Sequence, residues 1–271
     1  MDITLPHLSI ITGYYGVGKT NLSLNLVRAA ARKNEPVTLI DLDIINPYFR
    51  SSDYLQELQE QGVNLIAPTF ARSALETPSL PAAMNGAFDA PGTVIIDVGG
   101  DDAGATTLAR YRSDIQRRLD QMGRADSSSS SSDGGTQSAQ DSSDPESPQN
   151  PQYALWYVVN RYRSNAATPQ EAAVEAAGQL RDIETACKLK ATGIINNTHL
   201  QADTTIDIVL EGLAFAQATA ELTALPLIAT TIPEQLLNAA QSTPELEALS
   251  DAGKLWPLEL LVTTPWQNTA W

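Results

Sequence analysis

Short runs of apolar, mostly β-branched residues alternate along the chain with longer stretches in which apolar residues recur at helical spacing. The short runs predict buried strands, and the longer stretches predict amphipathic helices. Strands are expected over residues 8–12, 36–41, 63–67, 93–97, 153–160, 191–195 and 225–230, with a final edge strand or packing arm from residue 254 onward. Helices are expected over residues 21–33, 52–61, 79–88, 106–122, 168–190, 205–222 and 232–240. This alternation predicts an α/β fold with a mostly parallel sheet and helices on both faces.

One segment breaks the pattern. Residues 125–152 consist mainly of Ser, Asp, Gly, Gln and Pro, and they include a run of six serines. Such a composition cannot bury enough apolar surface to become ordered by itself. We therefore expect a single domain over residues 1–271, interrupted by a disordered insertion at about residues 125–152 that loops out between a helix and the next strand.

The turn between the first strand and the first helix has the spacing Gly-x-x-x-x-Gly-Lys-Thr. A strand, a glycine-rich turn and a helix form the context in which this spacing binds phosphate, because the glycines let backbone N–H groups point inward and the helix adds its positive end. The candidate binding residues are Gly13, Tyr14, Tyr15, Gly16, Val17, Gly18, Lys19, Thr20 and the adjoining Asn21. The turn therefore predicts a nucleotide-binding P-loop domain, and the alternative is a glycine-rich turn without a ligand.

Lys19 is expected to reach the β- and γ-phosphates and to be exposed when no ligand is bound, and the Thr20 hydroxyl is expected to ligate Mg²⁺. Two further acids come at the carboxyl ends of predicted strands. Asp97 ends the apolar run of residues 93–97, where a carboxylate helps to hold Mg²⁺ beside a phosphate loop. Asp43 follows the second strand and faces the same edge of the sheet, and its alternative role is that of a solvated acid or a helix N-cap.

Composition narrows the classes of function. The formal net charge is −15, which argues against DNA or an anionic membrane surface as the main partner. The single cysteine, Cys187, excludes a disulfide framework or a multi-cysteine metal site within one chain. The N-terminus has no signal-peptide pattern and no apolar run is long enough to cross a membrane, so we expect a cytoplasmic protein.

The motifs at residues 13–20, 41–43, 94–100 and 194–197 come in an order and spacing that resemble the MinD/ParA group, whose domain is named for CobQ, CobB, MinD and ParA. The resemblance covers nearly the whole chain apart from the insertion. It implies an ATPase with a parallel sheet of about seven strands. It also implies the cofactors ATP and Mg²⁺.

The same resemblance implies a role for each matching residue. Lys19 binds the phosphates, and Asp43 positions or activates the attacking water. Thr20, Asp43 and Asp97 make up the metal site, with Asp97 holding the water shell of the ion. A strand-end asparagine, Asn196 or Asn197, reads the edge of the adenine.

The chain departs from the group in the phosphate loop. Tyr14 stands where the group usually has a lysine that reaches across a nucleotide-sandwich dimer, and Tyr15 stands where a glycine is usual. Tyrosine cannot neutralise the charge that develops on phosphate, so we expect slow or partner-dependent hydrolysis, and a homodimer remains compatible with the sequence. The C-terminus lacks the basic amphipathic helix of a MinD-type membrane anchor.

Three functions fit these features. The first is an ATPase that acts as a nucleotide switch on an unidentified protein partner. The second is a small-molecule kinase or ATP-dependent ligase, with Tyr14, Tyr15, Tyr48 and Arg50 available to line a substrate pocket. The third is a nucleotide-binding regulator that does not hydrolyse its ligand.

Overall fold

The computed structural model describes residues 3–33, 35–43, 58–67, 84, 86–129 and 153–262. Eight strands form one sheet, and every neighbouring pair is parallel. The spatial order is β3-β2-β4-β1-β5-β6-β7-β8. The strands are β1 (Leu8–Thr12), β2 (Val37–Asp41), β3 (Asn64–Ile66), β4 (Thr93–Asp97), β5 (Tyr153–Val159), β6 (Gly193–Asn196), β7 (Leu227–Pro233) and β8 (Leu255–Leu258). The predicted α/β fold is thus confirmed. The resemblance implied about seven strands, and the eighth, β8, is the final edge strand expected from residue 254 onward.

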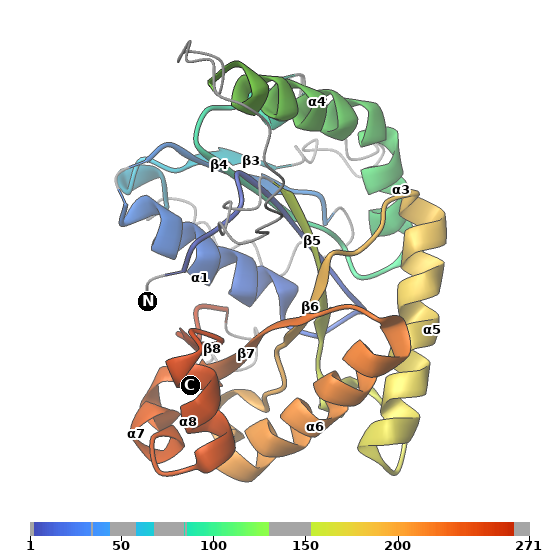
Figure 1. Cartoon of the computed structure of the whole chain (residues 1–271), viewed down its shortest axis with the longest axis vertical. Helices are drawn as coiled ribbons and strands as arrows, with labels where there is room; N and C mark the ends of the chain where they lie inside the picture. Colours follow the sequence, from blue (N-terminus) through green and yellow to red (C-terminus); the bar gives the residue numbers. More distant parts are fainter. Residues whose placement is uncertain are drawn as a thin grey trace, which may run out of the picture.

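Helices cover both faces of the sheet (Figure 1). They are α1 (Lys19–Ala31), α3 (Asp102–Arg110), α4 (Arg112–Ser129), α5 (Pro169–Cys187), α6 (Ile206–Thr223), α7 (Leu237–Ala240) and α8 (Pro244–Asp251). Leu8 and Ile10 of β1 pack in a core with residues of α3, α5 and α6, whereas Ile11 packs in a second core with Leu22 and Leu26 of α1. Both faces of the central strand are therefore buried, which explains its continuous apolar sequence. In the part of the chain that is described, no helix is long and apolar enough to span a membrane.

Several element boundaries differ from the sequence expectation. The single helix expected over residues 106–122 is two helices, α3 and α4, which meet at Tyr111. The backbone of α4 continues to Ser129, so it includes the first residues of the segment expected to be disordered, and residues 130–152 lie outside the described residues. Strand β7 extends to Pro233, so the helical stretch expected from residue 232 begins later, with a 3-10 turn at Glu234–Leu236. Most of the helices expected at 52–61 and 79–88 is also undescribed.

Because the strands are parallel, the loops that follow them all lie at the carboxyl edge of the sheet. Strand β1 lies between β4 and β5, and Ile11 of β1 and Asp41 of β2 are both in register with Asp97 of β4. Strands β2 to β4 lie on one side of β1, and strands β5 to β8 lie on the other. The loops that follow β4 and β5 therefore leave the sheet in different directions, on either side of the loop that follows β1. In open parallel sheets this is where ligands bind.

The start of α3 packs tightly against the loop that follows β4. Asp101 is the N-cap of α3, and its Oδ1 accepts a hydrogen bond from the Gly104 N–H at 2.8 Å. A Cβ atom at Gly104 would lie 2.3 Å from the carbonyl oxygen of Gly99, far inside van der Waals contact. Gly104 is therefore required for the backbone approach that sets the path of residues 98–101.

The close approach of Gly104 to Gly99 predicts that alanine substitutions at two helical glycines, Gly104 and Gly178, have opposite effects on stability. Gly104→Ala should lower the free energy of unfolding by about 1–3 kcal/mol, because the methyl group collides with backbone. Gly178→Ala in α5 is the matched control, since its nearest neighbour is an arginine side-chain atom at 3.9 Å. That change should raise the free energy of unfolding by about 0.5–1 kcal/mol through helix propensity. Urea unfolding measures both, and equal stabilisation by both substitutions would contradict the assigned role of Gly104.

Candidate functional site

The turn after β1 has the backbone of a phosphate-binding loop. Gly13, Gly16 and Gly18 have φ angles of 151°, 74° and 87°. A Cβ atom at Gly13 would lie 2.4 Å from the Val158 carbonyl oxygen, and one at Gly18 would lie 2.5 Å from Asn197 Nδ2. The first glycine is therefore needed where the loop passes β5, and the last where it passes the end of β6. Helix α1 begins at Lys19, directly after Gly18, so its N-terminal N–H groups face the loop.

Lys19 does not project into solvent as expected. The residue is only 7% exposed, and Nζ donates a hydrogen bond to the Tyr14 carbonyl oxygen of its own loop at 3.1 Å. The backbone of the β4–α3 loop covers it, because a Cβ atom at Gly100 would lie 2.6 Å from Lys19 Nζ and 2.7 Å from the Tyr15 nitrogen. The expectation of an exposed lysine was wrong because sequence spacing does not show that a second loop folds over the first.

Burial lowers the pKa of Lys19, and the neighbouring carboxylates of Asp97, Asp43 and Asp101 act in the opposite direction. The ammonium group therefore interacts with three acids from two segments of the chain, Asp43 after β2 and Asp97 and Asp101 at the end of β4 and in the loop after it. These acids help to hold its charge in a site from which water is largely excluded.

Asp97 ends β4 and is 4% exposed. Burial raises its pKa to about 7, helped by the charge of Asp41, while a hydrogen bond from Thr20 and the charge of Lys19 act against that rise. Its Oδ1 atom is buried and has no hydrogen-bond partner among the described residues. A buried carboxylate oxygen without a partner is an unusual feature that a cation or an ordered water would satisfy.

Thr20, Asp43 and Asp97 fit the oxygen chemistry that Mg²⁺ prefers. Thr20 contacts Asp97, and the carboxylate of Asp43 lies beside Gly99, where an added Cβ would be 3.4 Å from Asp43 Oδ1. The described part of the chain holds no cluster of three or more His, Cys, Asp or Glu residues suited to a metal. A magnesium ion at a phosphate loop takes most of its ligands from phosphate and water, so it does not need such a cluster.

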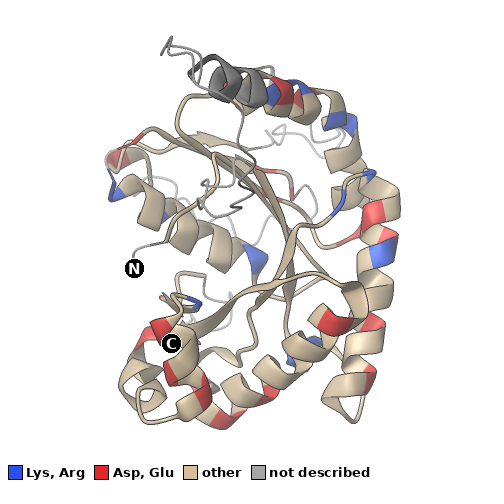
Figure 2. Cartoon of the chain, viewed as in Figure 1, with Lys and Arg blue, Asp and Glu red and all other residues tan. Residues whose placement is uncertain are grey.

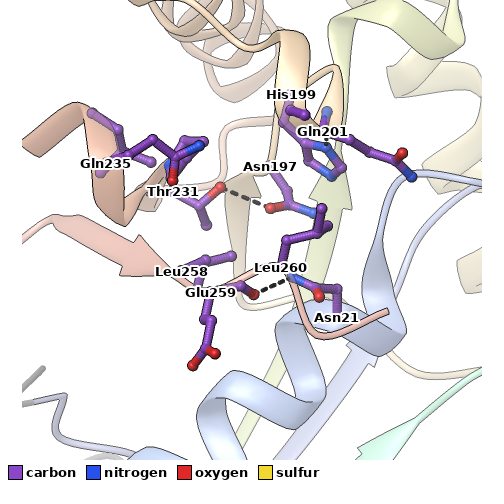
Figure 3. A pocket seen from close by; sticks show the side chains of 12 residues that line it. Asn21, Asn197, His199, Gln201, Thr231, Gln235, Leu258, Glu259 and Leu260 are labelled. Atoms are coloured by element: carbon purple, nitrogen blue, oxygen red, sulfur yellow. Dashed lines mark hydrogen bonds between the residues drawn. The ribbon is translucent and has the colours of Figure 1, made fainter. Parts of the chain in front are cut away.

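Two adjoining cavities lie at and beside the loop. The first, of about 260 Å³, is lined by Tyr15, Gly16, Gly18, Lys19, Thr20, Asn21, Asp43, Gly100, Arg163, His199, Gln201, Leu260 and Val262. The second, of about 130 Å³, is more apolar and includes Ile232, Pro233, Leu258 and Leu260 (Figure 3). The two share the residues Asn21, His199, Gln201 and Leu260. Together they have a charged end at the loop and an apolar end beyond it.

The two candidate asparagines at the end of β6 lie in different surroundings. Asn197 lines the apolar cavity, and its Oδ1 accepts a hydrogen bond from the Thr231 hydroxyl at 2.7 Å (Figure 3). Its Nδ2 donates to the Val17 carbonyl oxygen at 2.8 Å. Asn196 is fully buried, bonds to Thr198 and Thr230, and lines neither cavity. The structure therefore brings Asn197, and not Asn196, to the cavity.

The segment after β8 closes the apolar cavity and is held by α1. Asn21 donates from Nδ2 to the Glu259 carbonyl oxygen at 3.1 Å, and its Oδ1 accepts from the Leu261 N–H at 2.8 Å and the Val262 N–H at 3.1 Å. Arg28 and Glu259 form an ion pair at 2.7 Å. Asn21, expected as a binding residue, thus lines both cavities while its side chain anchors this segment.

Sequence reasoning missed Arg163 and His199. Arg163 Nε donates to the Gly16 carbonyl oxygen at 2.7 Å, and His199 lies beside Gly18, where an added Cβ would be 2.8 Å from Nε2. Burial, and then the charge of Arg163, lower the pKa of His199 to about 4, so it is neutral at pH 7. Both residues lie shortly after the carboxyl ends of strands, where ligands bind in parallel sheets. Only this position in the sequence could have indicated that they belong to the site.

The chain is similar in structure to several solved proteins. One is the signal recognition particle receptor FtsY from Elizabethkingia anophelis in complex with GDP, with 16% identity, a TM-score of 0.43, and coverage of 86% of this chain and 59% of that chain. FtsY from Mycoplasma mycoides has 14% identity and a TM-score of 0.44, covering 86% and 61%. Signal recognition particle 54 kDa protein from Aeropyrum pernix K1 in complex with GDP has 14% identity and a TM-score of 0.45, covering 93% and 50%. This chain therefore spans less than two thirds of the length of each.

No curated protein matches the sequence. A family model does match it, that of the CobQ/CobB/MinD/ParA nucleotide binding domain, over residues 8–233. The match runs from β1 to the end of β7, and so it includes the phosphate loop, both strand-end acids and the asparagines after β6. The resemblance noted in the sequence is thereby confirmed, and the chain belongs to the CobQ/CobB/MinD/ParA nucleotide binding domain family of P-loop proteins.

Proposed function

We propose that this protein binds Mg²⁺ and a nucleoside triphosphate, prefers ATP, and hydrolyses it slowly or under stimulation by a partner, as a nucleotide switch. The main support is the convergence on Lys19 of three segments far apart in the sequence: the phosphate loop, the end of β2 at Asp43, and the end of β4 at residues 97–101. Family membership supports nucleotide binding. The proposal adds to this the identity of the base, the hydrolysis and the coupling to a partner.

Binding a polyphosphate requires a rearrangement at Lys19. The ammonium group must leave the Tyr14 carbonyl oxygen to reach a phosphate, and Gly100 lies against both Lys19 and Tyr15. The ligand therefore has to displace the backbone around Gly100. This segment continues into the N-cap of α3 at Asp101, so the presence of a phosphate would be transmitted to a helix. Coupling of this kind is what a nucleotide switch needs.

Each polar group has a distinct part in the proposed reaction. The loop N–H groups and Lys19 would bind and orient the phosphates, and Thr20 and Asp97 would hold Mg²⁺, which would neutralise phosphate charge. Asp43 is half-buried at the cavity wall, where its carboxylate can hold the attacking water and accept its proton. Hydrolysis without a partner is slow because Tyr14 offers no positive charge.

A small-molecule kinase or ligase is the second candidate. It is favoured by the exposure of Tyr14 and Tyr15, at 45% and 62%, which places two aromatic side chains of the phosphate loop in contact with solvent. Release of ADP in the presence of fractionated cell extract separates the candidates. Stimulation by a macromolecular fraction supports the switch, stimulation by a small-molecule fraction supports the kinase, and no release supports a regulator without turnover.

The first prediction from the proposed function concerns nucleotide binding. Lys19→Ala should weaken nucleotide binding at least tenfold, because charge-assisted bonds to phosphate are lost. The variant should still unfold cooperatively. Lys254→Ala, which removes an exposed lysine far from the loop, is the control and should bind as wild type does. Titration calorimetry with Mg·ATP measures both, and unchanged affinity of the Lys19 variant would show that the loop does not bind phosphate.

The second prediction separates binding from turnover. Asp43→Asn should keep the dissociation constant of Mg·ATP within a few-fold but remove most hydrolysis, since an amide cannot accept the proton of the attacking water. Asp182→Asn, on the exposed side of α5, is the matched control. Phosphate release under single-turnover conditions gives the rate. A hydrolysis rate equal to that of wild type would show that Asp43 does not act on the attacking water.

The third prediction concerns the base. Guanine-selective P-loop proteins carry Asn-Lys-x-Asp after the corresponding strand, whereas this chain has Asn196, Asn197, Thr198 and His199. An asparagine amide both donates and accepts, which suits the mixed edge of adenine without strongly penalising guanine. ATP should bind more tightly than GTP by roughly tenfold, since one good pair of hydrogen bonds is worth about 1–3 kcal/mol. Competition binding at fixed Mg²⁺ tests this, and tighter GTP binding would overturn the assignment.

A further inference from the structure

Residue 14 of the phosphate loop, beside the first glycine, is a tyrosine and carries no positive charge. Two cationic side chains line the cavity at the loop among the described residues, Lys19 and Arg163. The acids of the cavity lie around Lys19. Arg163 is therefore the cationic side chain of this cavity that lies apart from those acids.

Two hydrogen bonds position Arg163, one within its own turn and one to the phosphate loop. It ends the short 3-10 helix Arg161–Arg163 directly after β5, and its backbone N–H donates to the Asn160 carbonyl oxygen at 3.0 Å. Its Nε donates to the Gly16 carbonyl oxygen at 2.7 Å. A Cβ atom at Gly16 would lie 3.1 Å from Arg163 Cζ, so the guanidinium lies directly against the middle of the phosphate loop.

The charge of Arg163 is not neutralised within the described residues. No carboxylate forms an ion pair with it there, and the bond to Gly16 uses only Nε. The neighbouring Arg161, by contrast, is buried and pairs with Glu211 at 3.1 Å. Figure 2 shows acidic residues along α6 and α8, in keeping with a net charge of −15. In so acidic a chain, an arginine without a carboxylate partner beside a phosphate loop is a notable arrangement.

The surroundings of Arg163 also favour an anion. His199, from the loop after β6, lines the same cavity, and its Nδ1 accepts a hydrogen bond from the Gln201 N–H at 3.2 Å. A neutral imidazole whose Nδ1 accepts carries its proton on Nε2, the atom beside Gly18. This side of the loop therefore presents donors, whereas the side of Asp43 and Asp97 presents acceptors.

We propose that Arg163 is a substrate-binding residue whose terminal guanidinium nitrogens donate to phosphate oxygens of the bound nucleotide, and that it supplies from within the same chain the positive charge that Tyr14 lacks. The inference rests on the proposed nucleotide binding. It follows that one chain holds a cation on each side of the polyphosphate, Lys19 and Arg163, without a contribution from a second copy.

A purely structural role is the main competitor. In that case Arg163 would only fix the loop through its bond to the Gly16 carbonyl oxygen, and its charge would not matter. Glutamine can donate a neutral hydrogen bond to a carbonyl, and lysine keeps the charge but not the planar guanidinium. The two substitutions therefore separate charge from loop fixation.

The experiment measures dissociation constants of Mg·ATP and Mg·ADP over a range of salt concentrations. It uses wild type, Arg163→Ala, Arg163→Gln, Arg163→Lys and the matched control Arg181→Ala, which removes an exposed arginine of α5. Arg163→Ala and Arg163→Gln should each bind about 10- to 100-fold more weakly, as expected for loss of a hydrogen bond to a charged group. Arg163→Lys should lose less, and Arg181→Ala nothing. The salt dependence should be shallower for the Ala and Gln variants than for wild type, because one charge contact is gone.

Thermal unfolding of each protein without ligand accompanies the titrations. Wild-type affinity in Arg163→Ala, or in Arg163→Gln, would overturn the inference. Equal losses in all three variants together with a lowered Tm would also overturn it, since they would indicate a structural role. If wild type itself binds no nucleotide, the proposed function fails and the inference fails with it. If wild type binds and only Lys19→Ala weakens binding, the inference alone fails.

Discussion

The site depends on an ammonium group that is held inside the protein. Lys19 is almost fully buried, donates to the carbonyl oxygen of Tyr14 and lies among the carboxylates of Asp43, Asp97 and Asp101. Moving such a charge out of water is costly unless opposite charges and hydrogen bonds compensate for it. The acids supply part of that compensation. Burial, helped by the charge of Asp41, raises the pKa of Asp97 to about 7, and the charge of Lys19 acts against that rise.

This balance explains why the loop after β4 closes over the phosphate loop. Gly100 touches Lys19 and Tyr15, and Gly104 lets α3 approach Gly99 closely enough to bring Asp101 to the site. A polyphosphate would compete for Lys19 and disturb the whole arrangement. A bound polyphosphate would therefore break contacts that stabilise the unliganded conformation. A nucleotide switch requires such a difference between the liganded and the unliganded conformation.

The opposite side of the site is built from chain segments that come late in the sequence. Asn197 joins the phosphate loop to β7 through Val17 and Thr231, and Asn21 joins α1 to the segment after β8. Arg163 contacts the loop from the end of β5. The site therefore has an acidic wall from β2 and β4 and a wall of donors and apolar groups from β5 to β8, so a nucleotide would be held between the two halves of the sheet.

The sequence by itself determined the fold class, the phosphate loop and most strands, because apolar runs, glycine spacing and strand-end acids are local patterns with local causes. It also indicated Asp43 and Asp97, because parallel strands bring their carboxyl ends to one edge. It did not reveal that α3 and α4 are separate, that Lys19 is covered, or that Asn197 and not its neighbour lines the cavity. Only the tertiary structure decided these points and the position of Arg163 against Gly16. Each depends on contacts between segments far apart in the sequence, and no local sequence pattern shows which distant segments will touch.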